Sequence, residues 1–220
     1  MCRTLRRKAV ENRRPAIMLG SGTMSGDRRI VIACALKKEA SGLREHLTSA
    51  RKLIVTGLGT DRTLRALEQQ LERFRPALVI FTGMAGQLDP ALGLGELVIP
   101  QCWRFESGDE FPVSAALVEG LRGRGWKIEG KGVTVRIPVV RQAHRLKVFR
   151  ETGARICDME SAAVLMICQS FGIPCVAAKI VSDTADSGML AFYRHFQHNI
   201  EVLAKRVEEL AADAERILAL

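Results

Sequence analysis

The sequence predicts an α/β fold with a parallel or mixed sheet and helices on both of its faces. Short apolar runs rich in β-branched residues alternate with segments of helical periodicity along the chain. Glycine and proline mark the turns between these segments. The chain has 220 residues, of which 47% are hydrophobic, and this is enough to bury a core without disulfides or a structural metal.

The positive charge of the chain is concentrated at its N-terminus. Residues 1–29 hold eight of the 33 Lys and Arg residues but two of the 24 acidic ones, so the net charge of +9 leaves the rest nearly balanced. We expect residues 1–29 to form a basic, disordered arm and residues 30–220 to form a single domain. The arm could touch an acidic membrane surface. No apolar run reaches the roughly 18 residues of a membrane span, so stable insertion is not expected.

The composition argues against two classes of ligand. Aromatic residues make up 5% of the sequence and do not interleave with basic ones, so nucleic-acid binding is not expected. His195 and His198 could share a helical face, but no third metal ligand lies near them in the sequence.

The six cysteines form no CxxC pair, and Cys34, Cys168 and Cys175 fall in apolar segments. This pattern is typical of reduced core residues in a cytoplasmic protein.

The first predicted unit is a strand over residues 30–36, followed by a helix over 37–47. It places Glu39 just beyond the carboxyl end of a strand, where ligands gather in open α/β sheets. A solvated helix residue is the alternative interpretation. The second unit is a strand over 53–55, a glycine-rich turn and an amphipathic helix that ends near Arg73.

The turn of the second unit reads Gly57-Leu58-Gly59 and opens a helix. Backbone N–H groups at such a turn can bind an anion, and Arg62 is placed to assist a phosphate there. The turn lacks the full GxGxxG dinucleotide fingerprint, and Arg62 could equally be a surface residue.

The third predicted strand, over residues 77–81, leads into Gly83, Met84 and Gly86. Two glycines permit a ligand to approach the backbone closely, although a simple tight turn needs them as well. The other elements that we expect before residue 156 are a strand over 97–100, a helix over 115–121, strand material over 133–140 and a helix over 144–151. A closing helix is expected over 191–220.

Residues 156–186 carry the strongest functional signal. An apolar helix ends at Gly172, and a buried strand follows over 175–181, so Glu160 lies where a helix begins and Asp183 where a strand ends. Carboxylates this close to apolar segments are costly unless they have partners. Spacing alone leaves an even alternative, in which Asp158 caps the helix and Asp183 lies in a surface turn.

Three motifs, in this order, resemble the nucleoside phosphorylase and methylthioadenosine/S-adenosylhomocysteine nucleosidase family. They are ALKKEA at 35–40, FTGMAGQLDPALGLGELVIP at 81–100, and CDMESAAV with FGIPCVAAKIVSDTAD at 157–186. The resemblance implies a three-layer α/β/α sandwich around a mixed, partly closed central sheet. It also implies a small nucleoside substrate, a homodimer or higher homo-oligomer, and no cofactor, with inorganic phosphate as a possible co-substrate.

The resemblance also assigns roles to single residues. Asp183 looks like the acid that protonates or hydrogen-bonds N7 of the leaving purine, and Ser182 looks like its orienting neighbour. Glu160 resembles the carboxylate that binds the ribose hydroxyls, and Met159 packs against the sugar. Glu39 matches the residue that positions or deprotonates the attacking water in the hydrolytic branch.

Other positions follow from the same resemblance. Gly83 and Met84 are expected to line the substrate site. Phe192 is expected to line its 5′ side, with a place in the hydrophobic core as an equal alternative. In a phosphorylase, Gly59 and Arg62 would hold phosphate.

The chain also departs from the family pattern. Gln87 replaces the last glycine of the usual TG-x-AGG, and residues 136–140 contain no aromatic ring to stack on the base. The turn near Gly59 and the compact length also resemble hopanoid-associated phosphorylases, which act on an adenosyl lipid. We therefore expect an enzyme that cleaves the N-glycosidic bond of a purine nucleoside, adenine-containing and 5′-modified, with water or phosphate. A non-catalytic nucleoside-binding module is the alternative.

Overall fold

The computed structural model describes residues 30–49, 51–184 and 188–219, with the side chains of 188–192 excepted. Within these residues, nine strands form one mixed sheet. The strands are β1 (Ile30–Cys34), β2 (Lys52–Val55), β3 (Leu78–Gln87), β4 (Leu97–Val98), β5 (Cys102–Phe105), β6 (Glu110–Pro112), β7 (Lys131–Thr134), β8 (Ala154–Asp158) and β9 (Cys175–Asp183). The helices are α2 (Lys37–Arg44), α3 (Thr60–Arg73), α4 (Ala115–Arg122), α5 (Gln142–Thr152), α6 (Ser161–Ser170) and α7 (Gly188–Leu218).

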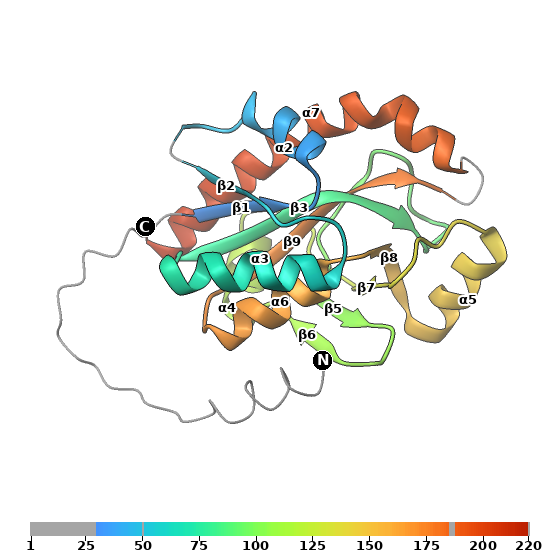
Figure 1. Ribbon diagram of the computed structural model, residues 1–220, viewed down its shortest axis with the longest axis horizontal. Coiled ribbons are helices and arrows are strands. Elements are labelled where there is room, and N and C mark those ends of the chain that lie inside the picture. Colours follow the sequence, from blue (N-terminus) through green and yellow to red (C-terminus); the bar gives the residue numbers. More distant parts are fainter. Residues whose placement is uncertain (1–29, 50, 185–187, 220) are drawn as a thin grey trace.

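The sheet lies between two layers of helices. Helices α2 and α7 cover one face and α3 and α6 the other, with α5 beside β8 at one end (Figure 1). The main strand order is β2-β1-β3-β8-β7-β5-β6, and β9 pairs with both β3 and β4. The predicted three-layer arrangement and mixed sheet are confirmed. The sheet is open rather than partly closed, because β2 and β6 lie at opposite ends of this order.

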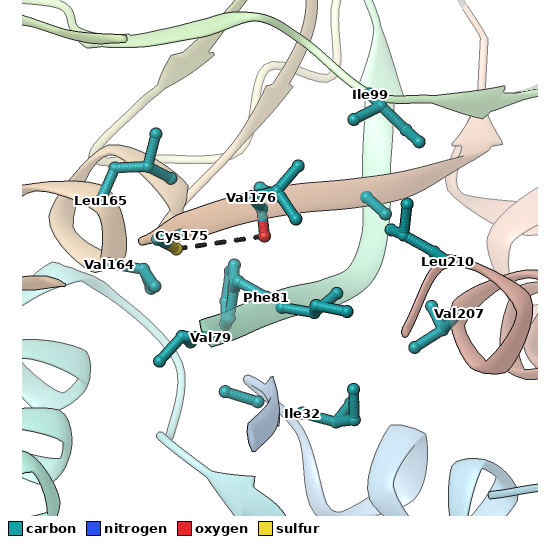
Figure 2. Packing of buried hydrophobic residues seen from close by; sticks show 14 of the residues in the cluster. Ile32, Val79, Phe81, Ile99, Val164, Leu165, Cys175, Val176, Val207 and Leu210 are labelled. Carbon is teal, nitrogen blue, oxygen red and sulfur yellow. Dashed lines mark hydrogen bonds between the residues drawn. The ribbon is translucent and has the colours of Figure 1, made fainter. Parts of the chain in front are cut away.

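The central strands are mostly apolar and buried because helices cover both of their faces. All five residues of β1 and all nine of β9 are buried. Figure 2 shows Phe81 of β3 between Val164 and Leu165 of α6 on one side and Val207 and Leu210 of α7 on the other. These residues belong to one continuous hydrophobic core.

Strand β3 connects three other strands. Its first half pairs in parallel with β1, its last two residues pair antiparallel with β8, and β9 runs parallel along its other side. The register between β3 and β9 shifts at Ala85 and Gly86, where Val181 and Asp183 are the successive partners, so Ser182 is the extra residue of a β-bulge. The carboxyl ends of β1, β3 and β9 therefore meet at one edge of the sheet.

Two expectations about the elements were wrong or incomplete. Strand β7 ends at Thr134, and of residues 135–140 only Val135 and Val139 are buried. Residues 136–138 are exposed, and Pro138 has no N–H group that could continue the ladder. Strands β5, β6 and β8 were not predicted, because charged residues such as Arg104, Glu110 and Arg155 interrupt their apolar patterns. The other predicted helices and strands are present with shifted ends.

In the part of the chain that the structure describes, no helix combines the length and apolar composition that crossing a membrane requires. Residues 1–29 lie outside the described residues, so the division at residue 29 stays a prediction.

Candidate active site

Glu39 lies in the first turn of α2, directly after β1. Its Oε2 accepts a 3.0 Å hydrogen bond from the backbone N–H of Leu36, and its Oε1 accepts one of 3.2 Å from Met84. The side chain is buried, so it is not the solvated helix residue of the alternative interpretation. Gly83 permits this approach, because a Cβ at that position would lie 2.8 Å from Oε1 of Glu39. The structure thus brings Glu39, Gly83 and Met84 together.

Glu160 lies at the beginning of α6 and faces the beginning of α3. The backbone N–H of Gly59 donates a hydrogen bond of 2.6 Å to its Oε1, and the hydroxyl of Thr60 donates to the carbonyl of Met159. The amide expected to bind phosphate thus binds a carboxylate of the chain itself. Arg62 is exposed and lines an open hollow of about 730 Å³ beside α3.

A buried ion pair lies next to the segment that leads into α6. Nζ of Lys179 lies 3.0 Å from Oδ2 of Asp158 and 3.8 Å from the centre of the Phe81 ring. Asp158 also accepts hydrogen bonds from the backbone N–H groups of Glu160 and Ser161. Asp158 therefore caps α6, as the alternative interpretation expected. Sequence reasoning missed Lys179, although a lone lysine within a buried strand signals an anionic partner.

The electrostatics of this region are dominated by burial. Burial raises the pKa of Glu39 above its ordinary value, and the ammonium of Lys179 offsets part of the rise. Burial and the carboxylate of Asp158 raise the pKa of Glu160 to about 7, against the opposing effects of Lys179 and the Gly59 hydrogen bond. Glu160 therefore exchanges its proton near neutral pH.

Asp183 lies at the end of β9, and 8% of its surface is exposed, so it is not in a surface turn. Its Oδ1 lies 2.7 Å from the hydroxyl of Ser182, which also lies 3.2 Å from the carbonyl oxygen of Ala85. Its Oδ2 forms an ion pair with Arg145 of α5. Sequence reasoning missed Arg145, because α5 has too weak an apolar stripe to show which side faces inward.

The remaining predicted positions are less informative. Met84 and Met159 are half-buried, and the side chain of Phe192 lies outside the described residues. Cys34, Cys168 and Cys175 are free and buried, as predicted. Among the described residues, no group of three or more His, Cys, Asp or Glu side chains is arranged to hold a metal ion.

Known proteins resemble this chain in sequence and in fold. A 5′-methylthioadenosine/S-adenosylhomocysteine nucleosidase of Geobacillus kaustophilus is 28% identical over 183 residues, which are 72% of this chain and 76% of the relative. The same enzyme of Helicobacter pylori, solved with butyl-thio-DADMe-Immucillin-A, has a TM-score of 0.73 at 17% identity and covers 84% of this chain and 98% of its own. The futalosine hydrolase of H. pylori also has a TM-score of 0.73 at 17% identity, with 84% and 97% covered.

The two H. pylori structures share the fold of this chain. A family model described as the phosphorylase superfamily matches residues 51–219, which is more than half of the chain and includes β2 to β9. The chain therefore belongs to the phosphorylase superfamily.

Proposed function

We propose that this protein is an enzyme that hydrolyses the N-glycosidic bond of an adenine nucleoside modified at its 5′ position. The observation that carries the proposal is the placement of Glu39 and Asp183 at the carboxyl ends of the parallel strands β1 and β9, with β3 between them. Glu160, at the beginning of α6, is near enough to Glu39 and Lys179 for their charges to act on its pKa. The names of the sequence relatives, methylthioadenosine/adenosylhomocysteine nucleosidases, support the same reaction and substrate class.

Asp183 acts on the base. Breaking the bond between C1′ and N9 places positive charge on the sugar and negative charge on the purine. A fixed side chain at N7 that donates or shares a proton stabilises the departing base, and such acid catalysis contributes about 10²–10⁴-fold. Ser182 supports this role because its hydroxyl lies 2.7 Å from Oδ1 of Asp183.

Glu160 acts on the sugar. In its ionised form the carboxylate accepts hydrogen bonds from the ribose hydroxyls and holds the sugar next to the nucleophile, which lowers the entropic cost of the reaction. Met159, the preceding residue, is half-buried and packs against the sugar in this arrangement.

Glu39 positions and deprotonates the attacking water. Two backbone N–H groups fix its carboxylate, and burial raises its pKa, which makes it a stronger base than an exposed glutamate. Water is favoured over phosphate because the Gly59 amide, the expected phosphate ligand, is already bound to Glu160. Neither a metal nor another cofactor has a step in this reaction, and phosphate as a co-substrate is the alternative that the experiment must exclude.

The test is base release from methylthioadenosine, adenosylhomocysteine and inosine, each with and without inorganic phosphate, with identification of the sugar product. We expect adenine and a free sugar in both conditions, and slow or no release of hypoxanthine from inosine. A sugar 1-phosphate that forms only with phosphate would establish phosphorolysis instead. If none of the three nucleosides releases its base while methylthioadenosine still binds, the chain is a nucleoside-binding module.

Two further properties belong to this proposal. A homodimer or higher homo-oligomer is the assembly that the resemblance to the family implies. A cytoplasmic location is supported by the free cysteines.

A further inference from the structure

Arg145 is an arginine buried inside a surface helix. Of the eleven residues of α5, only Arg145 and Val148 are buried, and Arg145 is 3% exposed. Burying a guanidinium is costly unless its charge and its N–H groups have partners. The helix therefore holds a permanent positive charge against the carboxyl end of the sheet.

The guanidinium joins the ends of two strands. Its Nη1 donates hydrogen bonds to the carbonyl oxygens of Gln87, at 2.8 Å, and Asp183, at 3.2 Å. Its Nη2 pairs with Oδ2 of Asp183. Its Nε is buried without a partner among the described residues. One planar guanidinium thus binds the last residues of both β3 and β9. The flexible ammonium of a lysine does not reproduce this arrangement.

Both oxygens of the Asp183 side chain are occupied. Oδ1 lies 2.7 Å from the Ser182 hydroxyl, and Oδ2 faces Arg145. Gly86 leaves room for the pair, since a Cβ there would lie 3.4 Å from both Nη1 of Arg145 and Oδ2 of Asp183. The nearby thiol of Cys157 stays uncharged because burial raises its pKa to about 12. Asp183 is therefore the acidic side chain that the guanidinium faces.

We propose that Arg145 is a positioning residue for base departure, acting through Asp183. This inference rests on the proposed function, in which Asp183 contacts the purine. Arg145 fixes the direction of the carboxylate and places a positive charge behind it. As the bond to the sugar breaks, negative charge builds up on the purine, and a fixed charge at that place stabilises it without reorganisation. Sequence reasoning gave Arg145 no role.

The test compares Arg145→Gln, Arg145→Lys and Arg150→Gln in adenine release from methylthioadenosine. Arg150 is the matched control, because it is exposed on the same helix. We expect Arg145→Gln to lower kcat by about 10–100-fold and to change KM by less than about threefold, since the charge acts mainly as the base leaves. Arg145→Lys should recover part of the loss, and Arg150→Gln should match the wild type. A wild-type kcat in Arg145→Gln would overturn the proposal.

A double-mutant cycle separates this role from a structural one. In an Asp183→Asn background, Arg145→Gln should lower the single-turnover rate by less than about threefold, because the group through which it acts is gone. An equal loss in both backgrounds would mean that Arg145 supports only the fold, and the proposal would fail. If Asp183→Asn releases no detectable adenine, the same cycle is scored on the adenine Kd measured by calorimetry. If Arg145→Gln does not fold, Arg145→Lys takes its place.

The two hypotheses fail in different ways. A wild-type protein that releases no base refutes the proposed function itself. A wild-type protein that releases adenine, together with an additive cycle, refutes only the role of Arg145.

Discussion

The backbone N–H of Gly59 lies 2.6 Å from Oε1 of Glu160, which is 101 residues further along the chain. The positive end of the α3 dipole and this hydrogen bond favour the ionised carboxylate. Burial and Asp158 favour the protonated form, and they dominate, because the pKa of Glu160 is raised to about 7. The residue that we assign to the ribose thus changes its charge in the physiological range.

Substrate binding should therefore depend on pH. Only the ionised Glu160 can accept hydrogen bonds from both ribose hydroxyls, so the KM for methylthioadenosine should fall as the pH rises from about 6 to 8 through the raised pKa of Glu160. Glu160→Gln should have a higher KM without this dependence. The measurement is initial rates across this range, with Glu151→Gln, an exposed residue of α5, as control. A flat wild-type profile contradicts the assignment.

The same titration should affect stability in the opposite direction. Since the pKa of Glu160 rises from 4.5 to about 7 on folding, the folded state holds this proton more tightly than the unfolded state. Its contribution to stability is complete below pH 4.5 and is lost as the pH rises through about 7. Urea unfolding should show Glu160→Gln gaining about 1–3 kcal/mol relative to the wild type between pH 4.5 and 8. A constant difference between the two proteins would exclude this titration.

Removing Lys179 should destabilise the fold strongly. Lys179→Met leaves the carboxylate of Asp158 buried without its cation, which costs about 3–5 kcal/mol in the free energy of unfolding. A second change, Asp158→Asn, should restore part of this loss. The control is Lys131→Met, because Lys131 pairs with Glu110 at 2.7 Å on the surface, where such a pair contributes about 0–1 kcal/mol. Equal losses for the two lysines would show that burial of the pair has no special effect.

Alanine substitutions at two glycines distinguish the effect of backbone strain from the effect of damage to the candidate site. Both Gly83 and Gly153 have positive φ angles, of 143° and 63°. A Cβ at Gly153 meets nothing within 4 Å, so Gly153→Ala should cost about 1 kcal/mol of stability and leave base release unchanged. A Cβ at Gly83 would lie 2.8 Å from Oε1 of Glu39 and must displace it, so Gly83→Ala should also slow base release. Full activity in Gly83→Ala would argue against Glu39 as the base.

Asp183→Asn should separate binding from turnover. An asparagine keeps the size of the side chain but cannot deliver a proton, so base release should fall by about 10²–10⁴-fold. Adenine should still bind, as measured by calorimetry. Asp61→Asn is the control, since Asp61 is exposed in the first turn of α3. Unchanged turnover in Asp183→Asn would remove Asp183 from the mechanism.

Some features of the site could be predicted because they follow the ends of strands. Glu39 and Asp183 come directly after apolar runs whose length and β-branched composition identify buried strands, and Glu160 begins a helix of small apolar residues. Parallel strands bring such positions to one edge of a sheet. Local pattern and position in the fold agree there, so the sequence was sufficient to place these residues, while their roles stay predictions.

The partners of these acids could not be predicted in the same way. The ion pair of Arg145 with Asp183 depends on where α5 packs, and only tertiary contacts determine this. The bulge at Ser182 depends on a register shift against β3, which an apolar run does not specify. Strand β8 joins β3 antiparallel while it runs parallel to β7, and this arrangement follows from the sheet as a whole.

The position of β9 has a consequence for folding. It is the last strand in the chain, and it pairs with β3 about a hundred residues earlier. Until residues 175–183 leave the ribosome, β3 has an unpaired apolar edge, and long-range pairing of this kind is slow and prone to aggregation. The segment from Cys175 onward thus both completes the site and protects the nascent sheet, so a truncation before Cys175 should yield an aggregating chain rather than a folded, inactive one.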